Sequence, residues 1–290
     1  MKNIKKFGAS VLALCFTAPT LLTACKTQNG MSTDGESSML PDSSLESVLD
    51  SPLDSAPPAE ESAPTQPQPP VEEPPSPPVT QKAQYIKCTG DRVNLRAGAG
   101  TDFAVLGSAE EGTMYAIIGK TGNWYKTYYK NQTAYFYASY ATVFSLEKTS
   151  EEVENVIEEG YKLLGVPYVY GAVRLHDGKG KLLGGFTAQK FDCSSLMQYI
   201  FYKGAGALLG VHTRAQVLQG DFVPKEELQR GDCIFFTNEQ RQYNKGIERV
   251  GHVALYLGDG YILHTASDYA RIEKISAKRW KFYIEARRFL

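Results

Sequence analysis

Residues 26–82 contain too few of the apolar side chains that a hydrophobic core requires. Folded structure is therefore expected only in the part of the chain that follows them. This segment contains no aromatic residue, 12 of the 15 prolines, and ten acidic residues against two lysines. It buries too little apolar surface to offset the entropy that a chain loses on folding. Its proline-dense part, residues 64–78, favours an extended polyproline II conformation. We interpret residues 25–82 as a disordered tether, with a proline-rich partner ligand as the open alternative, and expect folded structure from residue 83 onward.

The first 24 residues have the layout of an export signal. Lysines precede an apolar run over residues 7–22, and the small residues Thr23 and Ala24 come directly before Cys25. This arrangement indicates a secretory signal peptide rather than a membrane span. It resembles a bacterial lipobox, which implies removal of residues 1–24 and acylation of Cys25, whereas ordinary signal cleavage is the alternative. Two or more acyl chains would anchor the protein to a membrane, so we expect an exported lipoprotein that faces the cell wall or periplasm.

The remaining composition narrows the classes of function. The whole chain has a net charge of −1, and because the tether is acidic, residues 83–290 carry a small positive excess. That excess suits an anionic substrate but is too small to indicate nucleic-acid binding. The sequence contains no zinc-finger spacing, phosphate-binding glycine loop or dinucleotide fingerprint, so we expect no metal and no cofactor. Cys88 and Cys233 fall in different expected domains, and we interpret them as buried thiols rather than as a disulfide.

Residues 149–290 carry a cysteine and two histidines at positions suited to nucleophilic catalysis. The sequence around Cys193 reads as a loop that enters a helix over residues 193–203. At a helix N-terminus the unpaired N–H groups and the helix dipole favour an anion, so we expect the thiol pKa to fall below its ordinary value of roughly 8.5. A histidine base close to this thiol would complete a dyad that can attack a carbonyl carbon.

His252 and His264 lie on two strand-like stretches, residues 250–257 and 261–264, which flank a Gly-Asp-Gly turn. A three-residue loop pairs the two histidines directly, and a loop shifted by one residue makes them diagonal neighbours on the same face of the hairpin. In either register one histidine can act as the base while the other orients it. A two-residue loop would place them on opposite faces and would weaken this hypothesis.

A helix followed by an antiparallel sheet is expected around these residues. Thr149 and Glu152 form a predicted capping box for a helix over residues 150–164, and Gly165 stops that helix. The helix that carries Cys193 should pack on the sheet, which predicts an α+β fold with the site at the junction of helix and sheet. The expected strands are residues 232–237, 250–257, 260–266 and 282–289.

Five short motifs follow one another in an order that is typical of a known family. They are Pro167-Tyr168-Val169-Tyr170-Gly171, Asp192-Cys193-Ser194-Ser195, Arg230-Gly231-Asp232-Cys233-Ile234-Phe235-Phe236, Gly251-His252-Val253-Ala254-Leu255-Tyr256-Leu257-Gly258 and Leu263-His264. Residues 150–290 thereby resemble the NlpC-type cell-wall cysteine peptidases, which have a compact papain-like fold. Two features depart from that pattern. Residues 172–190 form a longer insertion before the nucleophile, and Cys233 occupies a position that is usually aliphatic.

The resemblance implies a role for several residues. Cys193 is the expected nucleophile, His252 the base that takes its proton, and His264 the residue that orients His252. The implied substrate is the peptidoglycan stem peptide, cut after γ-D-glutamate and before a diamino acid. The implied substrate-binding residues are Asp192 and Ser194, which would bind a free N-terminal L-alanine, Tyr168, which would line the cleft, and Arg214, which would meet a substrate carboxylate or form a surface salt bridge. His176, in the insertion, is expected to be exposed.

Residues 83–146 show the pattern of a small all-β barrel, because short β-rich stretches alternate with turns that contain Gly or Asn. Three motifs resemble those of a bacterial SH3-like domain, namely Asn94-Leu95-Arg96-Ala97-Gly98, Gly122-Asn123-Trp124-Tyr125-Lys126 and Ala138-Ser139-Tyr140. We expect a separate small unit. It could bind the cell wall or form a wall of the active-site cleft, while Trp124 and Tyr125 equally suit core packing.

Three functions therefore stand side by side. The leading one is a monomeric, lipid-anchored endopeptidase that acts on peptidoglycan peptides and does not bind nucleic acid. The second is an amidase or acyltransferase that uses the same cysteine and histidine on a different acyl group. The third is a wall-binding lipoprotein whose catalytic domain is vestigial.

Overall fold

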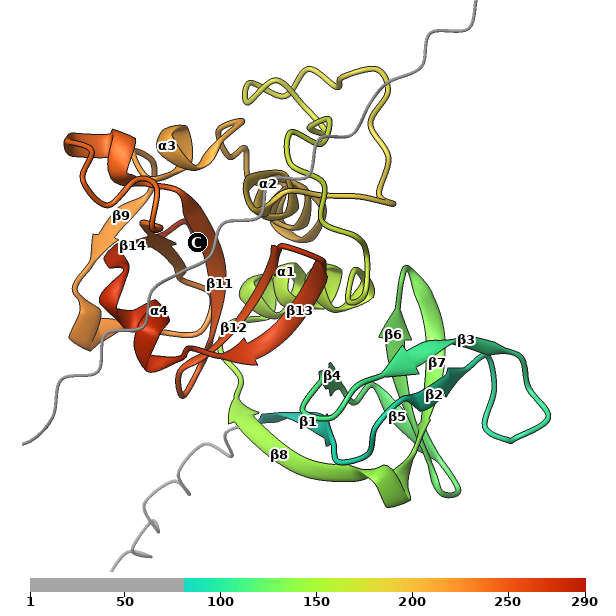
Figure 1. The fold of residues 1–290 in the computed structure, drawn as a ribbon. Coiled ribbons are helices and arrows are strands. Elements are labelled where there is room, and N and C mark those ends of the chain that lie inside the picture. The colour runs from blue at the N-terminus through green and yellow to red at the C-terminus, as the bar shows by residue number, and fades with distance from the viewer. Residues whose placement is uncertain (1–80) are drawn as a thin grey trace, which may run out of the picture. The chain divides into compact units, whose positions relative to one another are not determined.

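The computed structural model describes residues 81–290 (Figure 1). The expected signal peptide, the lipidation site at Cys25 and the tether up to residue 80 lie outside the described residues. Within the described part, no helix combines the length and the apolar character that a membrane crossing requires.

Residues 82–147 form the expected β-rich unit. Eight strands and one short 3-10 helix (η1, Ala138–Tyr140) make it up, and five of the strands form a sheet in the order β3-β2-β7-β6-β5. The tight turn between β6 and β7 is made by Lys130 and Asn131, which both have positive φ. The strands are β1 (Lys82–Cys88), β2 (Val93–Arg96), β3 (Val105–Ala109), β4 (Met114–Ala116), β5 (Gly119–Thr121), β6 (Trp124–Tyr129), β7 (Gln132–Tyr137) and β8 (Ala141–Glu147).

The other three strands of this unit join the C-terminal half of the folded region in one sheet. Its nine strands run in the order β8-β1-β4-β13-β12-β11-β10-β14-β9, and Met114 on β4 pairs with Ile272 on β13. The SH3-like region is therefore not the separate unit that the sequence suggested. The strands contributed by the second half are β9 (Asp221–Val223), β10 (Cys233–Phe236), β11 (His252–Gly258), β12 (Tyr261–Ala266), β13 (Tyr269–Lys274) and β14 (Tyr283–Arg288).

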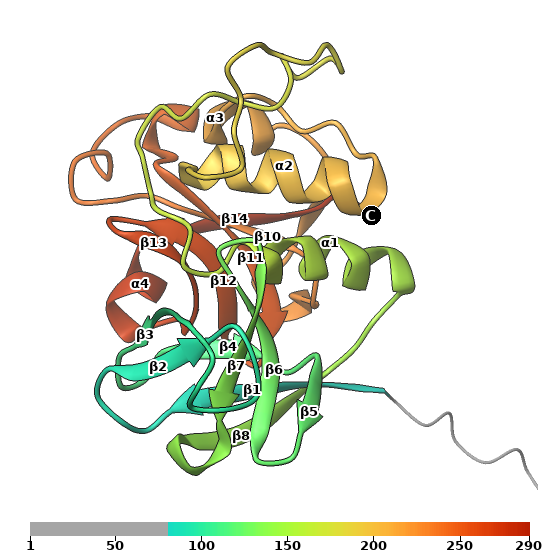
Figure 2. The same ribbon diagram turned by 90° about the vertical axis from the view of Figure 1, so that its right-hand side faces the viewer.

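Two long helices, α1 (Glu151–Lys162) and α2 (Cys193–Ala205), lie side by side against this sheet (Figure 2). They approach so closely that a Cβ on Gly204 of α2 would lie 2.4 Å from the Cα of Val156 on α1. Leu196, Ile200 and Phe201 of α2 are buried in the core. The shorter elements are α3 (Thr213–Gln216), α4 (Ala277–Lys281), η2 (Lys225–Glu227) and η3 (Gly246–Arg249).

Helix α1 differs from its prediction at both ends. The N-cap is Ser150, whose Oγ accepts a hydrogen bond from the N–H of Val153, and not Thr149 in a capping box with Glu152. At the other end the helix stops at Lys162, two residues early. The turn between β6 and β7 donates backbone hydrogen bonds to the carbonyls of Lys162 (2.7 Å) and Leu164 (2.8 Å), so an SH3-like hairpin satisfies the helix C-terminus.

Arg230 links the SH3-like strands to the C-terminal half of the folded region. Its side chain is 4% exposed, and all five of its N–H groups donate hydrogen bonds. Two go to the Glu154 carboxylate on α1, at 2.6 and 2.9 Å, and the others reach the hydroxyls of Tyr85 on β1 and Tyr161 on α1 and the carbonyl of Leu257 on β11. One buried guanidinium therefore joins three elements from both halves of the folded region.

Candidate active site

Cys193 is the first residue of α2, as the sequence predicted. Asp192 is its N-cap, and a capping box forms because Oδ1 of Asp192 accepts from the N–H of Ser195 (2.8 Å) while Oγ of Ser195 accepts from the N–H of Asp192 (2.9 Å). Cys193 is 8% exposed. These cap hydrogen bonds hold the first turn of α2 in one orientation. They thereby also orient the Cys193 thiol.

His252 and His264 make direct contact, with Nε2 of His252 2.9 Å from Nδ1 of His264. In the hairpin of β11 and β12, Leu255 pairs with Leu263 and Tyr256 with Ile262. Extended to the histidines, this register makes them diagonal neighbours on one face. The structure therefore adopts the second of the two registers that the sequence left open, and both histidines reach the same side of the sheet.

Glu273 extends the histidine pair, and the sequence analysis missed it. Its Oε1 lies 3.2 Å from Nε2 of His264, at an angle too poor for a regular hydrogen bond, and 2.9 Å from a guanidinium nitrogen of Arg279. Glu273 sits on β13, where His264 pairs with Arg271. It is thus a diagonal neighbour of His264 on the same face, just as His264 is of His252.

A cavity of about 530 Å³ contains both Cys193 and His252. The backbone N–H of Val253, next to His252 on β11, is among the groups that lower the pKa of the Cys193 thiol. Tyr168 lines this cavity, as expected for a residue of the cleft. Among the described residues, no residue of the SH3-like strands (82–147) lines this cavity. The other lining residues come from the loop after β10, from the β12 end and from the α4 region.

Burial dominates the electrostatics of the cysteine and the two histidines. It raises the pKa of Cys193 to about 12, the Asp192 charge adds to this, and the N–H groups of Val253, Ser194 and Cys193 oppose it. The expected lowering of the thiol pKa by the helix N-terminus is therefore wrong, because burial outweighs it. Burial, with the charges of His264 and Arg279, lowers the pKa of His252 well below its ordinary value. The resting pair is a neutral thiol and a neutral imidazole.

His264 and Glu273 form a second titrating pair. Burial lowers the pKa of His264, although the nearby carboxylate of Glu273 opposes this. Partial burial would raise the pKa of Glu273, but His264, Arg279 and Arg271 outweigh it and bring this pKa to about 2. Glu273 is thus a carboxylate throughout the physiological range, with its charge directed at the imidazole that contacts His252.

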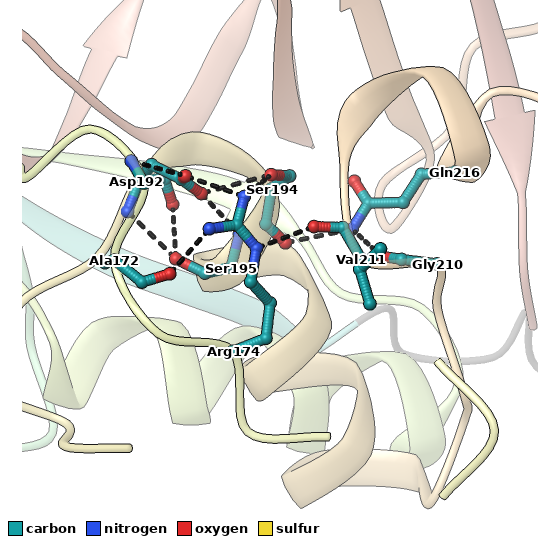
Figure 3. A network of polar contacts seen from close by, with 9 residues as sticks. Ala172, Arg174, Asp192, Ser194, Ser195, Gly210, Val211 and Gln216 are labelled. Atoms are coloured by element: carbon teal, nitrogen blue, oxygen red, sulfur yellow. Dashed lines mark hydrogen bonds and ion pairs between the residues drawn. The ribbon is translucent and has the colours of Figure 1, made fainter. Parts of the chain in front are cut away.

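Asp192 and Ser194, two of the predicted substrate-binding residues, belong to a buried polar network (Figure 3). Oγ of Ser194 donates to Oδ1 of Asp192 (3.1 Å), and Arg174 contacts both side chains. The carbonyl of Ser194 accepts from Nε2 of Gln216 (2.9 Å), which also donates to the carbonyl of Gly210 (2.9 Å). Nothing in the sequence pattern singled out Arg174, which lies in the insertion.

Arg214 and His176 also have clear positions. Arg214 lies 3.3 Å from a carboxylate oxygen of Glu248, which matches the salt-bridge alternative, and it lines a second cavity beside Cys193. His176 is fully buried, not exposed, because the insertion folds back and its ring packs on Tyr202 of α2 (centroids 5.2 Å apart). Residues 81–290 contain no cluster of acidic, His and Cys side chains that could hold a metal, and Cys88, Cys193 and Cys233 are unbridged there.

Comparisons with known proteins match two parts of this chain. The model of the NlpC/P60 family matches residues 165–288, and that of the bacterial SH3 domain matches residues 91–142. A gamma-D-glutamyl-L-lysine dipeptidyl-peptidase of Bacillus cereus is 27% identical over 209 residues, which cover 71% of this chain and 54% of that protein. The peptidoglycan endopeptidase RipA of Mycolicibacterium smegmatis is 35% identical over 113 residues, 39% of this chain and 21% of that protein.

A solved structure is also similar. The crystal structure of an NlpC/P60 family protein from Bacillus cereus covers 72% of this chain and 64% of that chain, at 25% identity and a TM-score of 0.38. The chain spans about half or less of the length of the curated relatives named above.

Proposed function

We propose that the chain is a peptidoglycan endopeptidase, because the NlpC/P60 family model matches residues 165–288 and the bacterial SH3 domain model matches residues 91–142. Its substrate is the stem peptide, and the bond it hydrolyses is the amide between γ-D-glutamate and a diamino acid. The printed activities of two relatives support this choice, since one is a peptidoglycan endopeptidase and the other a gamma-D-glutamyl-L-lysine dipeptidyl-peptidase. The observation that carries the proposal is that His252, whose Nε2 lies 2.9 Å from Nδ1 of His264, lines the same cavity as Cys193.

The first chemical step is general-base attack by a neutral pair. Because Nε2 of His252 contacts Nδ1 of His264, Nδ1 of His252 is the ring nitrogen that takes the Cys193 proton. This role requires Nε2–H of His252 to donate to His264, and Nε2–H of His264 to face Glu273. The thiol sulfur attacks the amide carbonyl as its proton moves, and the carboxylate of Glu273 stabilises the positive charge that then develops on the two imidazoles.

The later steps use the same groups. The N–H groups in the first turn of α2 lack partners within the helix, so the N–H of Cys193 is positioned to stabilise the oxyanion of the tetrahedral intermediate. The imidazolium of His252 then protonates the leaving amine, and the acyl group remains on Cys193. Water, deprotonated by His252, releases the acyl group and restores the thiol.

Mass spectrometry of defined stem peptides tests this proposal. We expect the full chain to cleave N-acetyl-L-Ala-γ-D-Glu-diamino acid peptides at the γ-D-glutamyl bond, and Cys193→Ala to abolish cleavage. Cys88→Ala, which removes another buried thiol, is the matched control and should retain activity. Unchanged cleavage by Cys193→Ala would refute the mechanism. Products joined to an added amine would indicate an acyltransferase, and wall binding without any cleavage would indicate a vestigial site.

We further propose that Cys25 is acylated, so that the enzyme faces the cell wall or periplasm from a membrane surface. The small residues before Cys25 and the preceding apolar run support this. Cells that express the wild type should incorporate labelled fatty acid into the protein and hold it in the membrane fraction. Cys25→Ser should lose both, and retention of the label by this variant would rule out Cys25 as the site.

A further inference from the structure

A second cavity, of about 370 Å³, opens beside the nucleophile and shares Cys193 and Tyr168 with the first. Its lining includes Asp192, Arg174 and Arg214. Asp192 is the only carboxylate among its lining residues. Any substrate ammonium that entered this cavity would therefore depend on Asp192 for charge compensation.

The Asp192 carboxylate has no acceptor capacity left for a ligand. Oδ1 accepts from Oγ of Ser194 (3.1 Å) and the N–H of Ser195 (2.8 Å), and Oδ2 accepts from the N–H of Gly171 (3.2 Å) and pairs with Arg174 (2.8 Å). Two partners for each oxygen fill the roughly four lone-pair sites of a carboxylate. The side chain is 6% exposed. Asp192 is thus occupied by its own neighbours, and its charge is already neutralised.

Arg174 is the residue that neutralises Asp192, and the insertion (residues 172–190) provides it. Its guanidinium is held from three sides, because Nε donates to the carbonyl of Val211 (2.7 Å) and the other nitrogens donate to the carbonyl of Ala172 (2.6 Å) and to Oγ of Ser194 (3.2 Å) (Figure 3). Two residues after Arg174, His176 is buried against α2, which holds this part of the insertion in place. The Arg174–Asp192 pair is therefore a built feature of the pocket floor rather than a loose surface contact.

Two further arginine side chains of this pocket can donate hydrogen bonds to a ligand. Arg214 and Arg241 line the pocket and share the single carboxylate of Glu248, which leaves positive charge in excess on this side. Guanidinium groups suit the carbonyl oxygen of an acyl group and repel an ammonium. No residue of the SH3 domain lines this pocket either, so among residues 81–290 no SH3 carboxylate takes over from Asp192.

We propose that this pocket receives an N-acylated first residue of the stem peptide and rejects a free ammonium, because Arg174 occupies Asp192. The proposal rests on the function proposed above and specifies its substrate class. The enzyme would act on stem peptides that are still joined through their amino end to the glycan, and Arg174 is the residue that sets this specificity. It is an alternative to the expectation that Asp192 and Ser194 bind a free N-terminal L-alanine.

Two peptides that differ only at the amino end test this inference. L-Ala-γ-D-Glu-L-Lys-D-Ala is used with a free amine and with an N-acetyl cap, and kcat/KM is measured for the full chain. We expect the capped peptide to be preferred by at least tenfold. Arg174→Met uncovers the Asp192 charge and should shift this ratio toward the free peptide by at least tenfold. Arg174→Lys keeps a cation at this place and should shift the ratio less. A wild-type preference for the free amine, or an unchanged ratio in Arg174→Met, would overturn the assignment.

Binding separates this inference from the proposed reaction. The Cys193→Ala variant, with and without Arg174→Met, is titrated with both peptides by calorimetry. Tighter binding of the capped peptide supports the pocket assignment even if neither peptide is hydrolysed, in which case only the proposed reaction fails. Equal binding of the two peptides, tighter binding of the free amine or no binding of either one contradicts the assignment. Thermal unfolding of each variant verifies that the comparison is made on folded protein.

Discussion

Glu273 lies diagonally across β12 and β13 from His264, with its Oε1 3.2 Å from Nε2 of His264. The candidate catalytic residues therefore form a series of four, Cys193, His252, His264 and Glu273. The series ends in a carboxylate and not in the neutral imidazole of His264. A carboxylate at the end of this series supplies the negative charge that a histidine alone lacks. Arg279, 2.9 Å from the same oxygen, holds Glu273 in place.

Removing the Glu273 charge should slow the reaction without preventing substrate binding. We expect Glu273→Gln to lower kcat by about 10- to 100-fold, part of the roughly 10²- to 10⁴-fold that general acid–base catalysis contributes. KM should change little, because Glu273 acts through His264. Glu239→Gln is the matched control, since Glu239 lines the same cavity but pairs with the exposed Lys278. Equal loss of kcat in both variants would contradict a specific role for Glu273.

The neutral resting pair predicts an unusual pH dependence of thiol reactivity. Because burial raises the pKa of Cys193 to about 12, the rate of alkylation by iodoacetamide should keep rising between pH 7 and pH 10. A thiolate–imidazolium pair would instead give a plateau that begins below neutral pH. Mass spectrometry of the labelled Cys193 peptide follows the rate, and Cys193→Ala reports the background from other cysteines. A plateau near pH 6 would show that substrate-free enzyme already holds a thiolate.

Stability should fall on mild acidification. Burial lowers the pKa of both His252 and His264 in the folded state, so below about pH 6.5 the unfolded chain binds protons that the folded chain refuses. The free energy of unfolding should thus decrease as the pH falls from 7 to 5. Glu273, with a folded pKa of about 2, adds a further loss below about pH 4.5. Urea titrations of wild type and His264→Gln test this, and an equal pH slope in both would exclude His264 as a contributor.

Arg230 should be among the most costly residues to replace. Arg230→Met would leave the Glu154 carboxylate without its cation and would remove one donor from each of two tyrosine hydroxyls, which keep only the bond to each other. Breaking a buried pair from one side costs about 3–5 kcal/mol. Chemical denaturation measures the change in the free energy of unfolding. Arg92→Met is the control, since that side chain is 77% exposed, and its midpoint should match wild type. A loss below about 1 kcal/mol for Arg230→Met would mean that water replaces the network.

Local sequence signals predicted much of the site. The helix start at Cys193, the hairpin of the two histidines, the α+β fold and both family resemblances are confirmed. Each of these rests on residues that are near one another in the sequence or on a spaced motif. The cap of α1 was placed one residue early because Thr149 and Ser150 are both good N-cap residues, and only the backbone geometry selects Ser150.

Other features depend on contacts that no local pattern contains. Glu273 lies in a short strand where polar and apolar residues alternate, so its carboxylate looks like any solvent-facing charge. Arg174 lies in a Gly- and Lys-rich insertion whose path could not be read from sequence. The thiol pKa was expected to fall because the helix N-terminus is visible in the sequence, whereas the burial that outweighs it appears only when α2 packs on β11.

The pairing of Met114 with Ile272 makes the backbone of one region part of the sheet of the other. While the two regions stay joined, the paired strands cover each other's edge at this point. Detaching either region would expose an open edge able to recruit foreign strands. The SH3 region of this chain is therefore poorly suited to exchange between proteins as an independent domain. Sequence change in its exposed loops would disturb the shared sheet less than replacement of the whole region.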